Sequence, residues 1–357
     1  MKIFDALSNY GHEQVVFCHE MATGLRAVIA IHNTICGPAL GGCRMWPFDS
    51  EEEAIEDAMR LSRGMTYKNA AAGLNLGGGE AVIIGDPNKD KSEALFRAFG
   101  RFIQSLGGRY ITTEDVGTSV EDMEYIKMET DYVSGLPMQF GGSGDPSPFT
   151  ALGTYEGIRA SVKYHLKKKN LKEIRIAVQG VGHVGYQLCE LLYEAGARLI
   201  VADIFEDKIE KVVNEFGAKA VRGDEIYSVD AEVFAPCALG AIVNDDTIER
   251  MKFKIIAGGA NNQLLDEHIH SRKLKKKNIL YAPDYLINAG GVINVFFEVI
   301  KEYNKDRVTK KVKNIYNILM DVYRMANDDN ITTVEAAARL AERRINLMRS
   351  VHQNYLR

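Results

Sequence analysis

One segment near the middle of the chain constrains the fold more than any other: three glycines spaced G-x-G-x-x-G between two apolar runs. The run IRIAV precedes them, and RLIVA follows a stretch with helical periodicity. Strand, helix and strand within about 30 residues form a βαβ unit, whose strands lie parallel in one sheet. The later runs EVFAP, KIIAG and ILYAP are short and apolar, so we expect the parallel sheet to continue through them to its edge.

The glycine spacing fits the binding of a dinucleotide. Gly180 permits a tight turn, Gly182 lets a pyrophosphate approach the backbone beside Val181, and Gly185 lets helix and sheet pack closely. The free N–H groups at the start of the helix favour the anion. The alternative is a glycine turn without a ligand. It is less favoured because an acidic residue, Asp203, follows the next strand at the expected distance.

Asp203 also indicates which dinucleotide binds. It stands 18 residues after Gly185, where a carboxylate hydrogen-bonds the ribose hydroxyls of NAD and repels the 2′-phosphate of NADP. The next residues, Ile204, Phe205 and Glu206, include no arginine that would hold that phosphate. The sequence therefore predicts NAD as the cofactor.

Length and composition limit the remaining possibilities. A chain of 357 residues suggests two domains, and the Gly- and Pro-rich segment 135–149 is the candidate hinge, the alternative being a long surface loop within one domain. The net charge of −4 does not indicate a surface that binds nucleic acid. No run of 18 or more apolar residues occurs, so no membrane span is predicted. The five cysteines show no CxxC spacing, and the N-terminus lacks the apolar stretch of a signal peptide. We expect a cytoplasmic protein without a metal.

Several helix starts and strands are also predicted. Ser50 with Glu53 marks the start of a long helix, and Thr332 with Glu335 marks the start of the last one. Residues 24–33 and the run AVII indicate strands, and the periodicity of residues 308–327 predicts one continuous helix.

Candidate chemistry in the first third is concentrated at isolated charges among glycines. Lys68 lies in an uncharged stretch from Met65 to Gly79, where it either reaches solvent or holds an anion. The triplet Gly77–Gly79 would let the backbone approach a ligand. Asp115, before a glycine, is either an acid–base group or a turn residue, and from the residues alone the turn is favoured.

Long ordered segments give the chain a resemblance to a known family. MTYKNAAAGLNLGGG, EDVG, GDPSP, VQGVG, FAPCALG, ANNQL and YAPDYLINAGGVINV are similar to segments of the leucine, phenylalanine and valine dehydrogenases, and the leucine enzymes are the most similar group. The resemblance covers nearly the whole chain. It implies reversible oxidative deamination, in which an L-amino acid, NAD and water give a 2-oxo acid, ammonium and NADH.

The resemblance also implies roles for individual residues. Lys68 would bind the substrate carboxylate, Asp115 would shuttle protons of the amino group, and Asn262 would help to hold the carboxylate. Asn261 and Asn288 lie beside it in the implied site, and Thr150 is similar to the residue that touches the nicotinamide side of the cofactor. The implied side-chain pocket suits a branched aliphatic group and is lined by Leu40, Thr113, Val292 and Val295.

Position 80 departs from the family. The family reads GGGK, and that lysine activates the attacking water and polarises the carbonyl, whereas this chain reads GGGE. A carboxylate at Glu80 cannot stabilise a developing alkoxide as an ammonium does, so we expect a severe loss of turnover with the fold and the NAD site intact. The alternative is that Glu80 turns towards solvent and a nearby lysine takes over its role. A lesser departure is His183, where the family usually has a small polar residue.

The resemblance implies an α/β architecture of two domains with a cleft between them. Residues 1–140 would bind substrate and mediate oligomerisation, residues 141–329 would form the Rossmann domain, and the last helix, about 330–357, would return to the first domain. Closure about the hinge would exclude water from the substrate. The partners implied are a small amino acid or 2-oxo acid and other copies of the chain, eight in the resembling family. The rival hypotheses are a non-catalytic binder of NAD or an amino acid, and a dehydrogenase of amines, against which Lys68 speaks.

Overall fold

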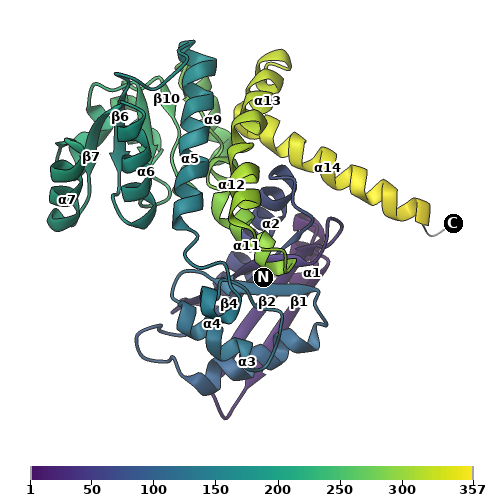
Figure 1. Ribbon diagram of the computed structural model, residues 1–357. Coiled ribbons are helices and arrows are strands. Elements are labelled where there is room, and N and C mark those ends of the chain that lie inside the picture. The colour runs from purple at the N-terminus through teal and green to yellow at the C-terminus, as the bar shows by residue number, and fades with distance from the viewer. Residues whose placement is uncertain (1, 356–357) are drawn as a thin grey trace. The chain divides into compact units, whose positions relative to one another are not determined.

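The chain forms two compact units, each built around its own sheet. The computed structural model describes residues 2–355. Unit 1 comprises Met1–Asp145, Val295–Tyr303 and Ala341–Arg357, and unit 2 comprises Pro146–Asn294 and Asn304–Leu340. The chain enters unit 2 at Pro146, within the Gly- and Pro-rich segment 135–149, which also contains the 3-10 turn η1 (Met138–Phe140). Figure 1 traces both units along the chain.

The sheet of unit 1 is mixed and has the order β1-β2-β4-β3-β5. Its strands are β1 (Gln14–Glu20), β2 (Leu25–Asn33), β3 (Ala39–Trp46), β4 (Gly77–Ile84) and β5 (Tyr110–Glu114). β2 runs antiparallel to β1 and β4, whereas β3 runs parallel to β4 and β5. The predicted strands at 24–33 and AVII are confirmed, and β4 begins earlier than expected, at the glycine triplet.

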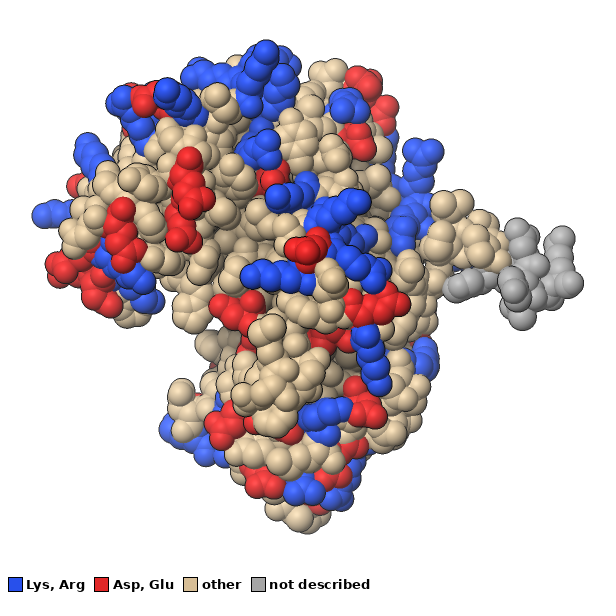
Figure 2. Space-filling view, in the orientation of Figure 1, with Lys and Arg blue, Asp and Glu red and all other residues tan. Residues whose placement is uncertain are grey.

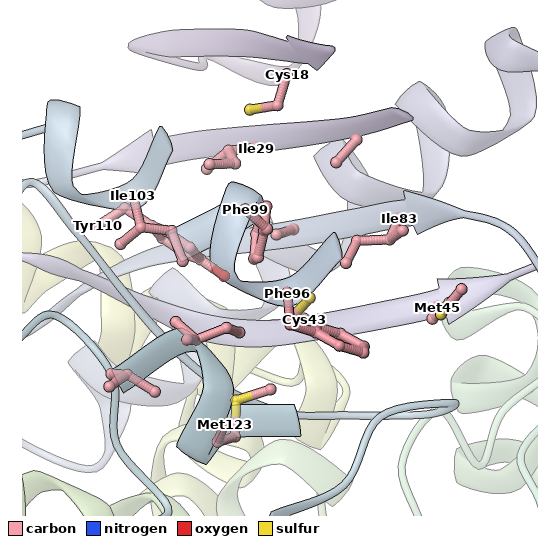
Figure 3. Close-up of a cluster of buried hydrophobic side chains, with 14 of the residues drawn as sticks. Cys18, Ile29, Cys43, Met45, Ile83, Phe96, Phe99, Ile103, Tyr110 and Met123 are labelled. Atoms are coloured by element: carbon pink, nitrogen blue, oxygen red, sulfur yellow. The ribbon is translucent and has the colours of Figure 1, made fainter. Parts of the chain in front are cut away.

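Helices cover both faces of this sheet. The face with Val28, Ala30 and Val82 packs against α2 (Glu51–Ala71), and α1 (Ile3–Tyr10) adds Leu7 to the same cluster. The opposite face packs against α3 (Glu93–Ser105) and α4 (Val120–Lys127) through the apolar cluster drawn in Figure 3. The predicted start of α2 is confirmed, because the Ser50 hydroxyl accepts a hydrogen bond from the Glu53 amide.

The sheet of unit 2 is entirely parallel, with the order β11-β10-β9-β6-β7-β8. The βαβ prediction and the continuation of the sheet to its edge are therefore confirmed, as is the two-unit α/β fold class. Its strands are β6 (Arg175–Gln179), β7 (Arg198–Ala202), β8 (Lys219–Ala220), β9 (Val233–Pro236), β10 (Ile255–Ile256) and β11 (Leu280–Tyr281). Its first helices are α5 (Ser147–Ser161), the π-helical turn η2 (Val162–Leu166), α6 (His183–Glu194), α7 (Glu206–Phe216), the 3-10 turn η3 (Gly223–Ser228), α8 (Asp245–Arg250), α9 (Glu267–Lys276) and α10 (Asp284–Ile287).

The last quarter of the chain is helical: α11 (Gly290–Val299), α12 (Lys305–Lys313), α13 (Ile315–Asp328) and α14 (Thr333–Tyr355). The single helix expected over 308–327 is wrong, because the chain breaks at Asn314, which ends α12 and precedes α13. Both apolar stripes remain buried, so the break turns the chain without exposing the core. The capping box at α14 is confirmed by reciprocal hydrogen bonds between Thr332 and Glu335.

Two absences concern the described residues alone. Within residues 2–355, no helix is both long and apolar enough to cross a membrane. In the same part of the chain, no group of three or more His, Cys, Asp or Glu side chains is arranged to hold a metal ion.

Candidate active site

One face of the unit 1 sheet gathers most of the residues predicted for substrate chemistry. Side chains alternate along a strand, and Ala39, Cys43 and Tyr110 belong to the cluster on the α3 face. The alternate residues of β3 and β5 therefore project on the face that α2 covers. In β4, Val82 packs against α2, so Glu80, two residues before it, shares that face. This face, which we call the α2 face, thus carries Leu40, Gly42, Arg44, Glu80 and Thr113, with Asp115 directly after β5.

Glu80 is buried in the middle of this face. Its side chain is 3% exposed, so the alternative in which it turns towards solvent is wrong. Its Oε2 accepts a hydrogen bond of 2.9 Å from the Gly42 amide. A Cβ placed on Gly42 would lie 2.7 Å from Oε1 of Glu80 and 2.6 Å from Cβ of Asp115, so both carboxyl side chains flank this glycine.

The surroundings of Glu80 favour its neutral form. Burial raises the pKa of Glu80 well above its ordinary value, and the nearby charge of Asp115 raises it further. The Gly42 amide and the Arg44 guanidinium act in the opposite direction and do not offset the burial. The environment of position 80 therefore disfavours a charged carboxylate, and the side chain there supplies no cation.

Arg44 organises the charges beside Glu80. Its Nε donates to Oδ2 of Asp115 at 2.8 Å, and its Nη1 donates to Oδ2 of Asp57 in α2 at 2.9 Å. Arg60 pairs with the other oxygen of Asp57 at 2.7 Å. Asp115 is thus held on one side by a guanidinium, and its backbone closes a turn with Thr118. The interpretation of Asp115 as a turn residue is confirmed, and its role as an acid–base group stays a prediction.

Sequence reasoning missed Arg44 and the Gly42 amide. The signal was present in GGCR, because strand alternation places Arg44 on the same face as Leu40 and Gly42. The partner in α2, Asp57, stands 13 residues after Arg44, but only the packing of α2 on the sheet brings the two side chains together.

The glycines of β3 and β4 let protein segments pack closely together. A Cβ at Gly77 would lie 1.9 Å from the carbonyl oxygen of Asn33, and one at Gly78 would lie 2.1 Å from the amide of Thr66. These two glycines therefore let neighbouring protein backbone approach closely, and the approach of the triplet to a ligand stays a prediction. The side chain of Asn69 also donates to the Gly77 carbonyl at 2.6 Å, which fixes the last turns of α2, including half-buried Lys68, on the face of Glu80.

The cofactor residues of unit 2 lie where β6 turns into α6. Gly180 has φ +88°, a conformation that side-chain-bearing residues rarely adopt, and a Cβ on Gly185 would lie 1.9 Å from the Gly180 carbonyl oxygen. Nothing lies within 4 Å of a Cβ placed on Gly182, which caps the N-terminus of α6. The turn therefore leaves open space in front of a helix start, which fits the pyrophosphate of a dinucleotide.

Asp203 follows β7 and reaches back to this turn. Its Oδ2 accepts from the amide of buried Val181 at 2.7 Å, and its Oδ1 accepts from the amides of Ile204 and Phe205 at 2.7 and 3.1 Å. The carboxylate is half-buried, and Ile204 and Phe205 are exposed. A carboxylate held by amides in this way keeps lone pairs for ribose hydroxyls.

The remaining predicted residues occupy two places. Buried Asn288 donates through Nδ2 to Oδ1 of exposed Asn261 at 2.5 Å, and its own Oδ1 has no partner among the described residues. Asn262 is exposed and has φ +50°. Thr150 lies in the first turn of α5, with its hydroxyl bonded to the Pro146 carbonyl.

The four residues predicted to line the side-chain pocket differ in exposure. Leu40 is buried and Thr113 is half-buried on the α2 face. In α11, Val292 is half-buried and Val295 is buried.

Family models match both parts of the chain. Residues 12–132 match the Glu/Leu/Phe/Val dehydrogenase dimerisation domain, and residues 201–352 match the Glutamate/Leucine/Phenylalanine/Valine dehydrogenase domain. The leucine dehydrogenase of Thermoactinomyces intermedius is 57% identical over 100% of this chain and 97% of its own, and that of Geobacillus stearothermophilus is 56% identical over 100% and 96%. A phenylalanine dehydrogenase of Bacillus thermotolerans is 51% identical over 96% of this chain and 90% of its own.

Solved structures agree with these relatives. The L-tryptophan dehydrogenase of Nostoc punctiforme is 47% identical, covers 97% of this chain and 99% of its own, and superposes with a TM-score of 0.87. The geometry of the glycine turn, together with these dehydrogenases, identifies NAD as the cofactor. The chain belongs to the Glu/Leu/Phe/Val dehydrogenase family and is an amino-acid dehydrogenase of the leucine dehydrogenase type.

Proposed function

We propose that this chain catalyses the NAD-dependent, reversible oxidative deamination of a branched-chain L-amino acid, and that Glu80 impairs its turnover. The observation that carries the proposal is the burial of Glu80 among Gly42, Arg44 and Asp115, at the position where the resemblance places a catalytic lysine. Leucine and phenylalanine dehydrogenases are both similar to the chain, so the deamination of an amino acid has broad support and the side-chain preference is the finer proposal.

The residues of the α2 face would have separate roles in the reaction. Lys68 would hold the substrate carboxylate, because an ammonium is a point charge that attracts a carboxylate strongly in a half-buried site. Asp115 would exchange protons with the substrate amino group, and Arg44 would position it through the 2.8 Å hydrogen bond to Oδ2. NAD, when bound, supplies the hydride acceptor. The pyrophosphate would lie at Gly180, Val181, Gly182 and Gly185, the ribose at Asp203, and the nicotinamide amide near Thr150, Asn261 and Asn288.

The raised pKa of Glu80 changes the expected cause of the loss of turnover. A charged carboxylate there would repel the substrate carboxylate, whereas an uncharged acid does so much less. The deficit that remains is the missing cation, which would stabilise the negative charge that develops on the carbinolamine oxygen as its hydroxyl loses a proton and the C–N bond breaks, leaving the 2-oxo acid and releasing ammonia. We therefore expect a loss of turnover that exceeds the loss of substrate affinity.

The proposed pocket suits a branched aliphatic chain. Leu40 and Thr113 would contribute from the α2 face, Val292 and Val295 would contribute from α11, and Asn262 would hold the substrate carboxylate with Lys68. Thr113 carries a methyl and a hydroxyl where a smaller residue would leave room for a ring. We accordingly propose that 2-oxoisocaproate binds more tightly than phenylpyruvate.

Assembly and domain roles complete the proposal. The dimerisation description of the matched family model supports a homo-oligomer, and the eight copies implied by the resemblance are the proposed number. Residues 1–140 would bind substrate and residues 141–329 would bind NAD, with the last helix returning to the first region. A cytoplasmic location stays a prediction. A purely non-catalytic role is disfavoured because the relatives that cover the whole chain are enzymes.

The proposal is tested by a panel of L-amino acids with NAD, assayed through NADH formation on this chain and on Glu80→Lys. We expect Glu80→Lys to oxidise L-leucine and its branched analogues faster than L-phenylalanine, and 2-oxoisocaproate to compete better than phenylpyruvate. Oxidation of no amino acid by either protein would refute the deamination. Tighter competition by phenylpyruvate would refute the pocket and leave the deamination standing.

A further inference from the structure

In unit 2, lysines gather where strands of the sheet begin, on the side of the sheet opposite to the glycine turn. The turn follows the carboxyl end of β6, whereas the lysines lie on η2 and on the segments that lead into β6, β10 and β11, at the amino ends of these strands. In a parallel sheet these amino ends meet at one edge. This group, which we call the lysine edge, comprises Lys163, Lys167, Lys168, Lys169, Lys172, Lys252, Lys254, Lys275, Lys276 and Lys277. Figure 2 shows basic side chains gathered over the end of α5.

A hollow of about 570 Å³ opens within the lysine edge. Its lining includes His165, Lys252, Lys254, Lys277 and Asn278. A second hollow of about 220 Å³ shares His165 and Asn278, so the imidazole lies at the boundary between the two. The larger volume is enough for a small ligand.

The charge around this hollow is not balanced by carboxylates. Within residues 2–355, Lys252, Lys254 and Lys167 form no ion pair, and Lys277 pairs with Glu249 at 2.8 Å. The carboxylates of Asp230 and Glu232, which lie along the same sheet edge before β9, are both bonded to Arg175 of β6. A chain with a net charge of −4 therefore has a local surplus of positive charge at a concave site.

The surroundings of His165 would let an anion bound at this site raise the pKa of its imidazole. It lies on the π-helical turn η2, a rare local structure that is frequent at functional sites, and its half-buried ring is hydrogen-bonded to the backbone of Asn278. Burial lowers the pKa of His165, and the charges of Lys167 and Lys254 lower it further. Among the described residues, the charges that shift the pKa of this ring are those of lysines, so a bound anion would supply a counter-charge.

We propose that the hollow formed by His165, Lys252, Lys254 and Lys277 is a binding site for a multivalent phosphate anion, distinct from the NAD site. The shared chemistry is a chain of phosphoryl groups, whose oxygens accept hydrogen bonds from ammonium groups and from imidazole. A free inorganic polyphosphate and the phosphate tail of a nucleotide both have this chemistry. The proposal does not depend on the deamination reaction, because the two sites lie at opposite edges of one sheet.

The test titrates inorganic tripolyphosphate into the full chain by calorimetry, at low ionic strength and with NADH present in saturating amount to fill the cofactor site. We expect saturable binding that weakens roughly tenfold or more in the double variant Lys252→Gln/Lys254→Gln, since each lost charged hydrogen bond weakens binding substantially. The matched control is Lys219→Gln/Lys310→Gln, which removes two exposed lysines of unit 2 away from the hollow. This control should bind tripolyphosphate as the parent does.

Two further measurements keep the proposal open to refutation. On saturation, the His165 ring resonances should show a raised pKa, and His165→Gln should bind more weakly with a smaller dependence of affinity on pH. Repeating the titration with ATP separates the sources: equal affinity assigns recognition to the phosphate chain, and tighter ATP binding that is lost in the lysine variant assigns it to a nucleotide. Absence of saturable binding, or equal losses in the hollow and control variants, would overturn the site. So would tighter binding of duplex DNA through the same lysines, because a macromolecular surface would then replace the small-anion site.

Discussion

Two buried or half-buried carboxyl groups, one in each unit, show how the same chemical group is put to opposite uses. Asp203 in unit 2 accepts hydrogen bonds from three backbone amides, at Val181, Ile204 and Phe205. Glu80 in unit 1 is 3% exposed, accepts from one amide and lies near Asp115. Amide donors favour a charged carboxylate, whereas burial beside a like charge favours the neutral acid. The two carboxyl groups therefore differ in their surroundings: Asp203 lies among amide donors, and burial beside Asp115 raises the pKa of Glu80.

The two units also use glycine differently. In unit 1 the glycines let strands and α2 pack together, and the catalytic groups are side chains. In unit 2 the glycine turn itself presents the backbone to the ligand. Damage to the glycine turn should consequently lower the affinity for the cofactor, and damage to the α2 face should lower turnover and substrate affinity while leaving the cofactor affinity unchanged.

The largest effect that separates the units is expected from Gly185→Ala. Its new Cβ would lie 1.9 Å from the Gly180 carbonyl oxygen, so the turn must shift, at a cost of about 1–3 kcal/mol. We expect NADH affinity, measured by fluorescence, to fall by roughly 10- to 100-fold. Gly223→Ala is the matched control, because nothing lies within 4 Å of its Cβ. Equal affinities for the two variants would refute the packing role of Gly185.

A smaller effect is expected from Asp203→Ala. Removing the carboxylate removes its repulsion of a 2′-phosphate and its hydrogen bonds to ribose, so the preference for NADH over NADPH should narrow by about tenfold. Binding of both reduced cofactors is measured by fluorescence on the parent and the variant. A parent that binds NADPH as tightly as NADH would contradict the predicted selectivity.

The smallest effect concerns stability and pH at Glu80. Because the folded pKa of Glu80 is raised above its unfolded value, the folded state holds the proton more firmly, and stability falls as pH rises above the ordinary pKa of a glutamate. Glu80→Gln removes this titration. Urea unfolding of the two proteins should therefore show a difference that favours the variant increasingly from mildly acidic to neutral pH. A difference independent of pH would mean that Glu80 is charged in the folded protein.

The sequence predicted the cofactor unit more completely than the catalytic face. The turn at Gly180 and Gly182, the approach of Gly185 and the place of Asp203 follow from local spacing within one βαβ unit. The network of Glu80, Arg44 and Asp57 joins β4, β3 and α2, and nothing local in the sequence indicates that these segments meet. The break at Asn314 was missed for a related reason: the apolar stripe continues across it, and the fold, rather than the periodicity, sets where the helix ends.

The family resemblance indicates that position 80 matters for catalysis, and the structure shows which groups surround it. From the sequence alone, Glu80 was expected to be unable to stabilise a developing alkoxide, with an outward-turned side chain as the alternative. Its burial and its hydrogen bond from the Gly42 amide show a carboxyl group held in place, with a pKa raised by burial and by Asp115. The raised pKa supports the proposal that the lost cation, rather than an added negative charge, would be the main cause of a loss of turnover.

The central claim is that position 80 limits catalysis because it lacks a cation. It is tested most directly by kcat/KM for L-leucine with NAD in this chain, Glu80→Gln and Glu80→Lys, at equal concentration and with NADH affinity measured as a control. A single lost donor of this kind changes rates by roughly 10²–10³, so Glu80→Lys should be faster than the parent by about that factor. Glu80→Gln, which is neutral like the protonated acid, should stay close to the parent. A lysine variant no faster than the parent, with its NADH affinity intact, would contradict the account and make Glu80 a working part of a different mechanism.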